Sequence, residues 1–341
     1  MMMRLVAVAA VVAAVAVGAV AVRARHLLSP AGEAVHSELF VIESGDSMGA
    51  FTRRLEERKL VRSARATRLL ARWHGLDAQL HVGEYELSPH LRPAEILEIV
   101  TTGRVKTWPV TVPEGTRASD IALRLEEAGL ADGQAFLEAA YDPALAEELG
   151  VSGATLEGYL YPDTYRLPKG MGAREVARTM VRQFERVWRE QIAERAAGSP
   201  LSKGEIVTLA SIVEKETADP DERPLIAAVF MNRLERGMRL ETDPTVIYGI
   251  PDFDGNLKRS HLRDRSNPYN TYRIPALPPG PIASPGAEAL LAVVEPAETN
   301  YLYFVSRNDG THEFSATYRE HSAAVDEYQR RRRSRERAAR R

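Results

Sequence analysis

Residues 209–217 read Leu209-Ala210-Ser211-Ile212-Val213-Glu214-Lys215-Glu216-Thr217 and predict an amphipathic helix. Apolar residues recur at helical spacing from Ile206 to Val213, and Glu216 falls on the same apolar face. Glu214 lies roughly 200° around this helix, among positions that we expect to be exposed. Because burial disfavours the charged form of a carboxyl group, we expect the pKa of Glu216 to rise toward the range of a general acid near neutral pH.

A buried glutamate also has an ordinary explanation. In soluble proteins such a side chain is more often satisfied by an arginine or a backbone N–H group than used in catalysis. The interpretation of Glu216 therefore depends on the rest of the chain.

The composition narrows the class of protein. The chain has 341 residues, of which 44% are hydrophobic and 27% charged, enough for two or three cores. The formal net charge of -2 argues against nucleic acid as the main partner. Cysteine is absent, which excludes disulfides, thiol catalysis and thiolate metal sites.

The N-terminal segment is long enough to cross a membrane. Residues Leu5 to Val22 carry no charge, and about 18 to 20 apolar residues span a bilayer. We therefore expect a cytoplasmic N-terminus and a transmembrane anchor over residues 1–25, with the body outside the cytoplasmic membrane. A cleaved signal peptide is the alternative, since Gly18-Ala19-Val20-Ala21 offers small residues for cleavage. Arg23 and Arg25 oppose the expected orientation, but long domains cross despite such a bias.

Two similar units are predicted after the anchor, about 70 residues apart. Strands near Phe40 and Val110 each lead through a glycine turn into an amphipathic helix. In the first unit, residues 35–105, the order strand, two helices and strand predicts a small α+β fold. This unit resembles LysM, a βααβ module that binds glycan strands.

The second unit, residues 106–200, holds a segment rich in tyrosine. Three tyrosines and two carboxylates lie between Leu156 and Tyr165. Aromatic rings with polar tips suit stacking on sugars. Glu157, in this segment, is a candidate substrate-binding residue. Tyrosine is equally ordinary in half-buried strands, so the segment alone defines no site. A long amphipathic helix, about Ala173 to Ala197, ends the unit.

Residues 201–328 form the predicted catalytic domain. Its first helix begins near Ser202 with a capping box, and another runs from Pro224 to Arg236. Between Glu241 and Pro285 the periodicity is weak, and the many Pro, Gly, Asn and Tyr residues predict a long ordered loop.

Two features lie at the C-terminal end. A hairpin is predicted between Tyr301 and Phe314, where we interpret His312 as a surface residue. The tail, residues 329–341, is rich in arginine and is interpreted as a solvated helix end or as a contact to anionic lipid or wall polymer.

Carboxylate chemistry is what the remaining residues allow. The chain has no Walker loop, no GxGxxG after a strand, no GxSxG elbow and no HExxH, so neither a metal nor a nucleotide cofactor is needed. Ordinary glycoside hydrolysis uses two carboxyl groups. A lytic transglycosylase uses one, because the 6-hydroxyl of the sugar attacks the anomeric carbon and closes a 1,6-anhydro ring. Its acid must hold a proton near pH 7, which an apolar helix face allows.

Several motifs in the chain are long and specific. They are Leu209–Thr217, Val229–Leu234, Thr242–Gly249, Tyr269–Tyr272 and Leu277–Ile282. Together with the tyrosine-rich segment and the hairpin, they resemble the YceG-like endolytic murein transglycosylases over residues 38–330.

The resemblance implies a single-pass inner-membrane protein with a LysM-like unit. Its catalytic domain would cleave the MurNAc–GlcNAc β-1,4 bond inside nascent peptidoglycan strands and end their elongation. The implied partners are glycan strands, the cytoplasmic membrane and wall synthases of the penicillin-binding class. The catalytic acid is implied at Glu216. Other positions that match family motifs, with roles in sugar binding or loop support, are Asn232, Asp243, Tyr248, Tyr269, Asn270 and Tyr272.

The sequence therefore predicts an α+β protein with a membrane helix, a LysM-like unit, a second α+β unit and a catalytic domain with a long loop. Two other functions stay open. One is a noncatalytic glycan-binding scaffold that recruits synthases, with Glu216 merely buried. The other is a hydrolase in which Asp243 or Glu241 activates water.

Overall fold

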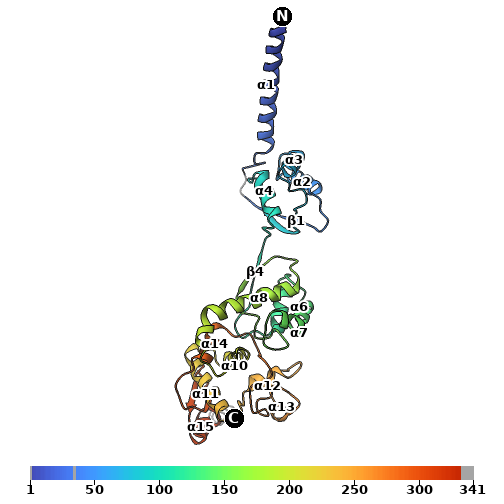
Figure 1. Ribbon diagram of the computed structural model, residues 1–341. Helices are drawn as coiled ribbons and strands as arrows, with labels where there is room; N and C mark the ends of the chain where they lie inside the picture. Colours follow the sequence, from blue (N-terminus) through green and yellow to red (C-terminus); the bar gives the residue numbers. More distant parts are fainter. Residues whose placement is uncertain (1, 34–35, 332–341) are drawn as a thin grey trace. The chain divides into compact units, whose positions relative to one another are not determined.

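A computed structural model describes residues 2–33 and 36–331 of the chain (Figure 1). The predicted α+β class is confirmed: helices predominate, and the strands form two-stranded sheets in the described part of the chain. The chain folds into two compact units, Met1–Trp108 with Arg166–Gly170, and Pro109–Tyr165 with Met171–Arg341. The segments that the sequence separates at residue 200 both lie in the second unit. Most of the predicted arginine-rich tail lies outside the described residues.

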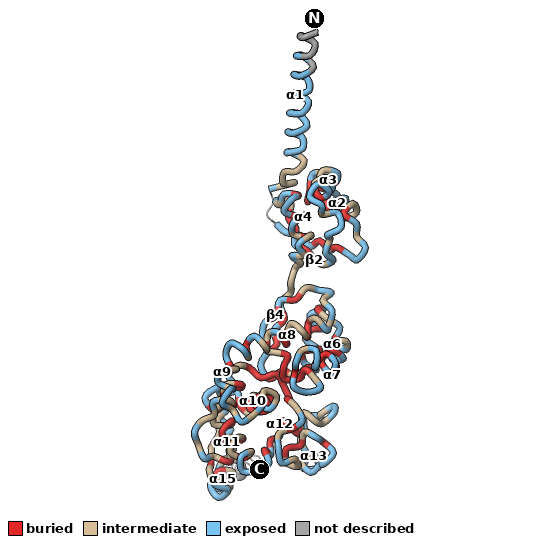
Figure 2. Tube along the Cα trace, viewed as in Figure 1, coloured by how far each residue is buried: buried red, intermediate tan, exposed pale blue. Residues whose placement is uncertain are grey.

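Helix α1 (Met2–Leu27) carries the N-terminal apolar run. Its window Ala10–Leu27 has a mean hydropathy of 1.6, long and apolar enough to cross a membrane. No residue of this window is buried, and residues 10–26 are exposed (Figure 2). The helix is therefore compatible with a membrane anchor, although a signal sequence would pass the same test of length and composition.

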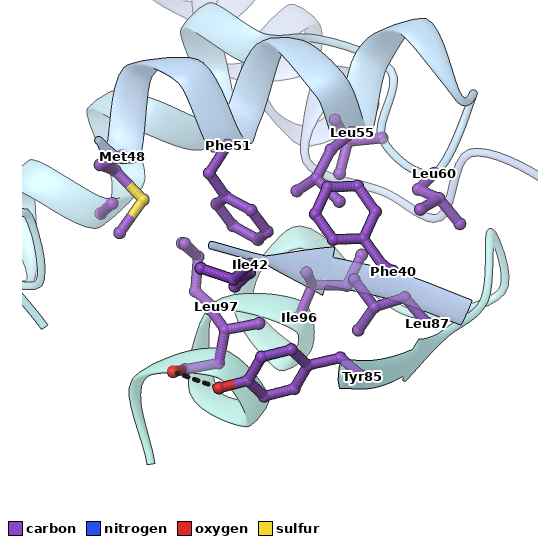
Figure 3. Packing of buried hydrophobic residues seen from close by; sticks show 13 residues of the cluster. Phe40, Ile42, Met48, Phe51, Leu55, Leu60, Tyr85, Leu87, Ile96 and Leu97 are labelled. Atoms are coloured by element: carbon purple, nitrogen blue, oxygen red, sulfur yellow. Dashed lines mark hydrogen bonds between the residues drawn. The ribbon is translucent and has the colours of Figure 1, made fainter. Parts of the chain in front are cut away.

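The first unit has the predicted order of strand, two helices and strand. Its elements are β1 (Glu38–Ile42), α2 (Met48–Glu57), α3 (Ala64–Trp73), β2 (Gly83–Leu87) and α4 (Pro93–Thr101). Strands β1 and β2 pair antiparallel, with Phe40 opposite Tyr85. Because side chains alternate across a strand, Phe40 and Ile42 point to one face and meet Phe51 and Leu97 from the helices in a single core (Figure 3).

The second unit begins with helices and one small sheet. In chain order these are β3 (Trp108–Thr111), α5 (Ala118–Glu127), α6 (Gly133–Ala140), α7 (Pro143–Glu148), β4 (Thr164–Leu167), α8 (Ala173–Val187), a π-helical turn (Trp188–Ile192) and α9 (Ala193–Ala196). Strands β3 and β4 form the sheet. The long helix predicted from Ala173 to Ala197 is thus present, with a π-helical turn near its end.

The remainder of this unit forms the candidate catalytic part. Its elements are α10 (Lys203–Glu216), a 3₁₀ turn (Pro220–Glu222), α11 (Arg223–Glu235), α12 (Asp243–Tyr248), α13 (Arg259–Arg263), α14 (Ala287–Val294), β5 (Tyr303–Ser306), β6 (His312–Ser315), α15 (Tyr318–Val325) and a π-helical turn (Asp326–Arg331). Strands β5 and β6 form the predicted hairpin. The expectation of one irregular loop between Glu241 and Pro285 was wrong in part, because Pro244 in the first turn starts α12, and α13 follows.

Helix α10 is the centre of this part. The predicted capping box is present, with Ser202 and Glu205 exchanging side-chain bonds. All eight residues from Ile206 to Val213 are buried, because α10 packs against α14, α11 and α12. The amphipathic interpretation was therefore wrong for residues 206–213, which are enclosed on every side, and only at the end of the helix does an exposed residue, Lys215, lie between Glu214 and Glu216. The helix ends at Glu216 because Thr217 adopts an extended conformation, with φ of -141°.

Gly158 joins the tyrosine-rich segment to the candidate catalytic part. Its φ of +83° is in the left-handed region, and an added Cβ atom would lie 2.4 Å from the Cβ of Pro281. Gly150, in the same unit, has a φ of +67° with nothing within 4 Å of such an atom.

We expect Gly158→Ala to destabilise the protein more than Gly150→Ala. Both variants carry the strain of a left-handed residue, about 1–2 kcal/mol, but only Gly158→Ala adds overpacking, typically about 1–3 kcal/mol. Urea unfolding of the two variants measures the difference. Equal loss of unfolding free energy would show that Pro281 moves away freely.

Candidate active site

Glu216 lies at the C-terminal end of α10 and lines a pocket of about 380 Å³. The hydroxyl of Thr242 donates a hydrogen bond to its Oε1 atom. The pKa of Glu216 is raised to about 6, mainly by burial and also by the negative charge of Asp243, although the Thr242 hydrogen bond and the charges of His312 and Arg233 act to lower it. The carboxyl group therefore exchanges its proton close to neutral pH.

A buried threonine cluster orients the donor. The Thr242 backbone N–H donates to Thr271 Oγ1 at 3.0 Å, and the Thr245 hydroxyl donates to the Thr242 carbonyl at 2.8 Å. The hydroxyls of Thr245 and Thr271 share a bond of 2.8 Å. Next to them, Glu241 has a left-handed φ of 52°, a conformation that costs free energy in a residue with a side chain. The backbone is thus held in the conformation that directs Thr242 toward Glu216.

The pocket combines acids, aromatic rings and one arginine. Its lining is Glu216, Arg233, Leu240, Glu241, Thr242, Asp243, Tyr272, Tyr303, Phe304, Tyr318 and His321. Rings with polar tips around a few charged groups are a surface on which a sugar can stack and form hydrogen bonds.

Arg233, on α11, organises the pocket floor. Its guanidinium donates to the carbonyl of Leu302 at 2.7 Å and to that of Leu240 at 2.7 Å. The group also lies 5.3 Å from the ring centre of Tyr303. Arg233 therefore joins the hairpin strand to the loop that carries Glu241 and Thr242, a role that the sequence did not indicate beyond its place beside Asn232.

An aromatic wall comes from β5 and α15. Tyr303 stacks on His321 at 5.1 Å between ring centres and contacts Tyr318 edge-on at 6.0 Å. Burial lowers the pKa of His321, and the charge of Arg233 lowers it further. Its Nδ1 atom is buried and has no hydrogen-bond partner among the described residues. Sequence reasoning missed this wall, since only the fold brings α15 to the pocket.

Glu214 has a different environment from the one expected. Its side chain is only 6% exposed, and Oε1 lies 3.1 Å from Arg223. Its Oε2 atom accepts the N–H group of Gly286 at 3.1 Å. The expectation of an exposed Glu214 was wrong because α14 and Arg223 enclose this side of α10. Both oxygens have partners, so Glu214 joins α10 to its neighbours and does not line the pocket.

Of the other predicted site residues, Asp243 and Tyr272 line the pocket with Glu216. Tyr272 donates its hydroxyl to Asp243 at 2.8 Å. By contrast, the Asn232 amide donates to the carbonyls of Thr299 and Tyr301 at 3.0 and 2.9 Å. Asn232 therefore positions the start of the hairpin and does not line the pocket.

Asn270 also supports the backbone. Its side-chain amide donates to the carbonyls of His261 and Asp264 at 3.1 and 2.6 Å, and its side chain is fully buried. It holds the loop after α13 in place and is absent from the pocket lining.

Glu157, Tyr248 and Tyr269 form a second cluster. Glu157 is 1% exposed and accepts bonds from the Ala118 N–H group at 3.1 Å and from the Tyr248 hydroxyl at 3.2 Å. Burial raises the pKa of Glu157 to about 7. The rings of Tyr248 and Tyr269 lie 4.7 Å apart. Since Glu157 is enclosed, it joins α5 to α12 and is not accessible to a glycan in this conformation.

His312 is not the surface residue that the hairpin suggested. Its Nδ1 atom lies 2.6 Å from Glu222, and its side chain is 12% exposed. The hairpin is covered on this side by the turn that follows α10, which explains the difference. Within the described ranges, no three His, Asp or Glu side chains converge as metal ligands.

Comparisons with known proteins agree on one family. The family model of the YceG-like family matches residues 40–327. An endolytic murein transglycosylase of Bacillus subtilis is 28% identical over 308 residues, which cover 84% of this chain and 83% of that protein. One from Streptococcus pneumoniae serotype 2 is 29% identical over 260 residues, covering 67% of this chain but 46% of the pneumococcal protein.

A solved structure has the same fold. The crystal structure of a yceG-like protein from Listeria monocytogenes superposes with a TM-score of 0.59 at 29% identity, and covers 85% of this chain and 99% of the Listeria chain. With a family model that spans most of its length, this chain belongs to the YceG-like family.

Proposed function

We propose that this chain is an endolytic lytic transglycosylase, a lyase that acts on peptidoglycan, with Glu216 as its single acid and base. The observation that carries the proposal is a carboxyl group with a pKa of about 6 in an aromatic, polar pocket. The names of the bacterial relatives, endolytic murein transglycosylases, support the substrate class.

The proposed reaction cleaves the β-1,4 bond between MurNAc and GlcNAc in nascent strands. Protonated Glu216 donates its proton to the glycosidic oxygen, and the bond from this oxygen to the anomeric carbon breaks. The 6-hydroxyl of the same MurNAc then attacks the anomeric carbon, and its proton passes to the Glu216 carboxylate. The product carries a 1,6-anhydro end, no water is consumed, and Glu216 is protonated again.

The surroundings of Glu216 suit both steps. With a pKa of about 6, about one molecule in ten holds the proton at pH 7. The Thr242 hydroxyl stabilises the carboxylate that forms after the first proton transfer. Asp243 and Tyr272 are the predicted sugar-binding residues that the pocket geometry supports.

A hydrolase is the second candidate. Glu241 and Asp243 line the same pocket as Glu216, and either could activate a water molecule. A noncatalytic scaffold is the third, and it predicts no cleavage at all. The product ends distinguish the three functions: a transglycosylase gives 1,6-anhydro ends, a hydrolase gives reducing ends, and a scaffold gives no new ends.

The cellular setting is part of the proposal. We infer that α1 is a single-pass anchor in the cytoplasmic membrane and that the body lies on its outer side, where peptidoglycan is made. The βααβ unit is proposed to bind glycan as LysM does, and wall synthases are the proposed partners because they supply nascent strands.

The catalytic assignment is tested with uncrosslinked glycan strands and mass spectrometry of the ends. The unaltered chain should produce 1,6-anhydro ends, and Glu216→Gln should lower turnover by about 10²–10⁴-fold, the usual contribution of a general acid. Glu214→Gln should keep turnover per folded molecule but lose about 1–3 kcal/mol of stability, because Arg223 loses a buried partner. Reducing ends would establish hydrolysis instead, and loss of turnover only in Glu214→Gln would transfer the role to that residue.

The raised pKa of Glu216 should also make the free energy of unfolding depend on pH. A raised carboxyl pKa stabilises the folded state fully at low pH, and this contribution is lost as the pH rises through about 6. A shift from 4.5 to about 6 corresponds to about 2 kcal/mol. Glu216→Gln should therefore be more stable than the unaltered chain by about 2 kcal/mol at pH 8, and equally stable at pH 4.

Urea unfolding at both pH values measures this difference. Exposed Glu190 supplies the control: Glu190→Gln should change the unfolding free energy by the same amount at both pH values. If Glu216→Gln stabilises the protein by the same amount at both pH values, the raised pKa assigned to Glu216 is wrong.

The aromatic wall should contribute to binding. Tyr318 is 69% exposed and lines the pocket. Loss of sugar stacking, about 1 kcal/mol, should raise KM for glycan strands about fivefold in Tyr318→Ala and leave kcat unchanged. Leu123→Ala, at a 57% exposed position on α5, is the control. An unchanged KM in Tyr318→Ala would show that this aromatic wall does not bind the glycan.

A further inference from the structure

Helix α3 in the first unit has two different faces. Ala64, Thr67 and Ala71 are buried against the unit. On the outside, Leu69 is 68% and Trp73 is 84% exposed. These two side chains are four residues apart, so they lie together on one face of the helix. A large exposed apolar pair of this kind indicates a surface that something covers.

This face lies beside the end of α1. An open hollow of about 810 Å³ separates the two helices. Its lining includes Val20, Arg23 and Leu27 on one side and Arg65, Leu69 and Trp73 on the other. Leu69 and Trp73 therefore lie at the level of the last turns of α1.

The chain between α1 and the first unit is short and tied down. Arg62 donates to the Pro30 carbonyl at 2.9 Å, and the Gly32 N–H group donates to the Pro89 carbonyl at 3.0 Å. Since α1 ends at Leu27, the three residues to Pro30 reach at most about 10 Å. When α1 spans a bilayer, the first unit is held against the membrane surface.

The charge of this surface is basic. Arg23, Arg65 and Arg72 are exposed and line the hollow, and no acidic residue does so among those described. Arg72 also pairs with Asp77 at 3.4 Å, so Arg23 and Arg65 supply most of the positive charge. Tryptophan prefers the headgroup level of a membrane, and arginines near it are attracted to anionic lipids. Apolar side chains between arginines thus complement an anionic bilayer surface.

We propose that the exposed face of α3, formed by Arg65, Leu69, Arg72 and Trp73, lies on the surface of an anionic bilayer next to the point where α1 leaves it. The inference rests on the proposed membrane anchor. It gives the first unit a membrane contact in addition to its proposed glycan binding.

The absence of cysteine allows a direct test. Three single-cysteine variants of the full chain, each carrying a nitroxide label, are reconstituted in vesicles that contain phosphatidylglycerol. Trp73→Cys reports the proposed surface. Val41→Cys, at a 41% exposed position on β1, is the matched control on another face of the same unit, and Val12→Cys reports α1 itself. Collision with oxygen and with a water-soluble nickel complex measures the depth of each label.

The label at position 73 should lie about 5–10 Å into the headgroup and acyl boundary, as in other interfacial helices, and the label at position 41 should stay in water. In vesicles of phosphatidylcholine alone, the label at position 73 should become more accessible to nickel; equal depth in both vesicles would contradict the role of the arginines.

If the label at position 12 is in the bilayer while that at position 73 is as accessible as that at position 41, the docking surface is refuted and the anchor stands. If the label at position 12 is also in water, the anchor itself fails. A label at position 73 that only added glycan strands immobilise would assign the face to the wall polymer and overturn the proposal.

Discussion

The candidate site depends on one constraint: the last residue of a largely buried helix is a carboxylic acid that opens into a pocket. Eight consecutive residues of helix α10, Ile206 to Val213, are buried, and the last residue of the helix, Glu216, lines the pocket. Desolvation raises the pKa of this group to about 6, and the hydrogen bond from the Thr242 hydroxyl opposes that effect. The threonine cluster, the strained backbone at Glu241 and the arginine on α11 all maintain this arrangement, so the chemistry follows from how the end of one helix is packed.

The two glutamates of this helix show how much neighbours decide. Glu214 and Glu216 are two residues apart and chemically identical. An arginine and a backbone N–H group occupy the oxygens of Glu214, which fixes it as a structural residue. Glu216 has a hydroxyl partner and a pocket. The difference arises because α11 and α14 supply Arg223 and Gly286 on one side, whereas the hairpin and α15 leave space on the other.

In the first unit, too, packing against neighbours decides the role of a helix, here the proposed contact of α3 with the membrane. Its core is small and formed by two strands and three helices, yet one helix leaves Leu69 and Trp73 uncovered beside the end of α1. In water such exposure has a free-energy cost, and a bilayer surface removes it. Membrane attachment through both a spanning helix and a flat amphipathic face would restrict the rotation of the unit, which matters for an enzyme whose proposed substrate is made at that surface.

The sequence by itself determined the α+β class, the apolar N-terminal helix, the capping box at Ser202 and the motifs of the YceG-like family, because these are local patterns of spacing and residue type. Only the tertiary structure decided that α10 is enclosed, that Glu157, Asn232 and Asn270 make structural contacts, that His312 pairs with Glu222, and that Arg233, Tyr318 and His321 join the pocket. The physical reason is that burial and hydrogen-bond partners come from segments far apart in the chain, which no periodicity within one helix or loop records.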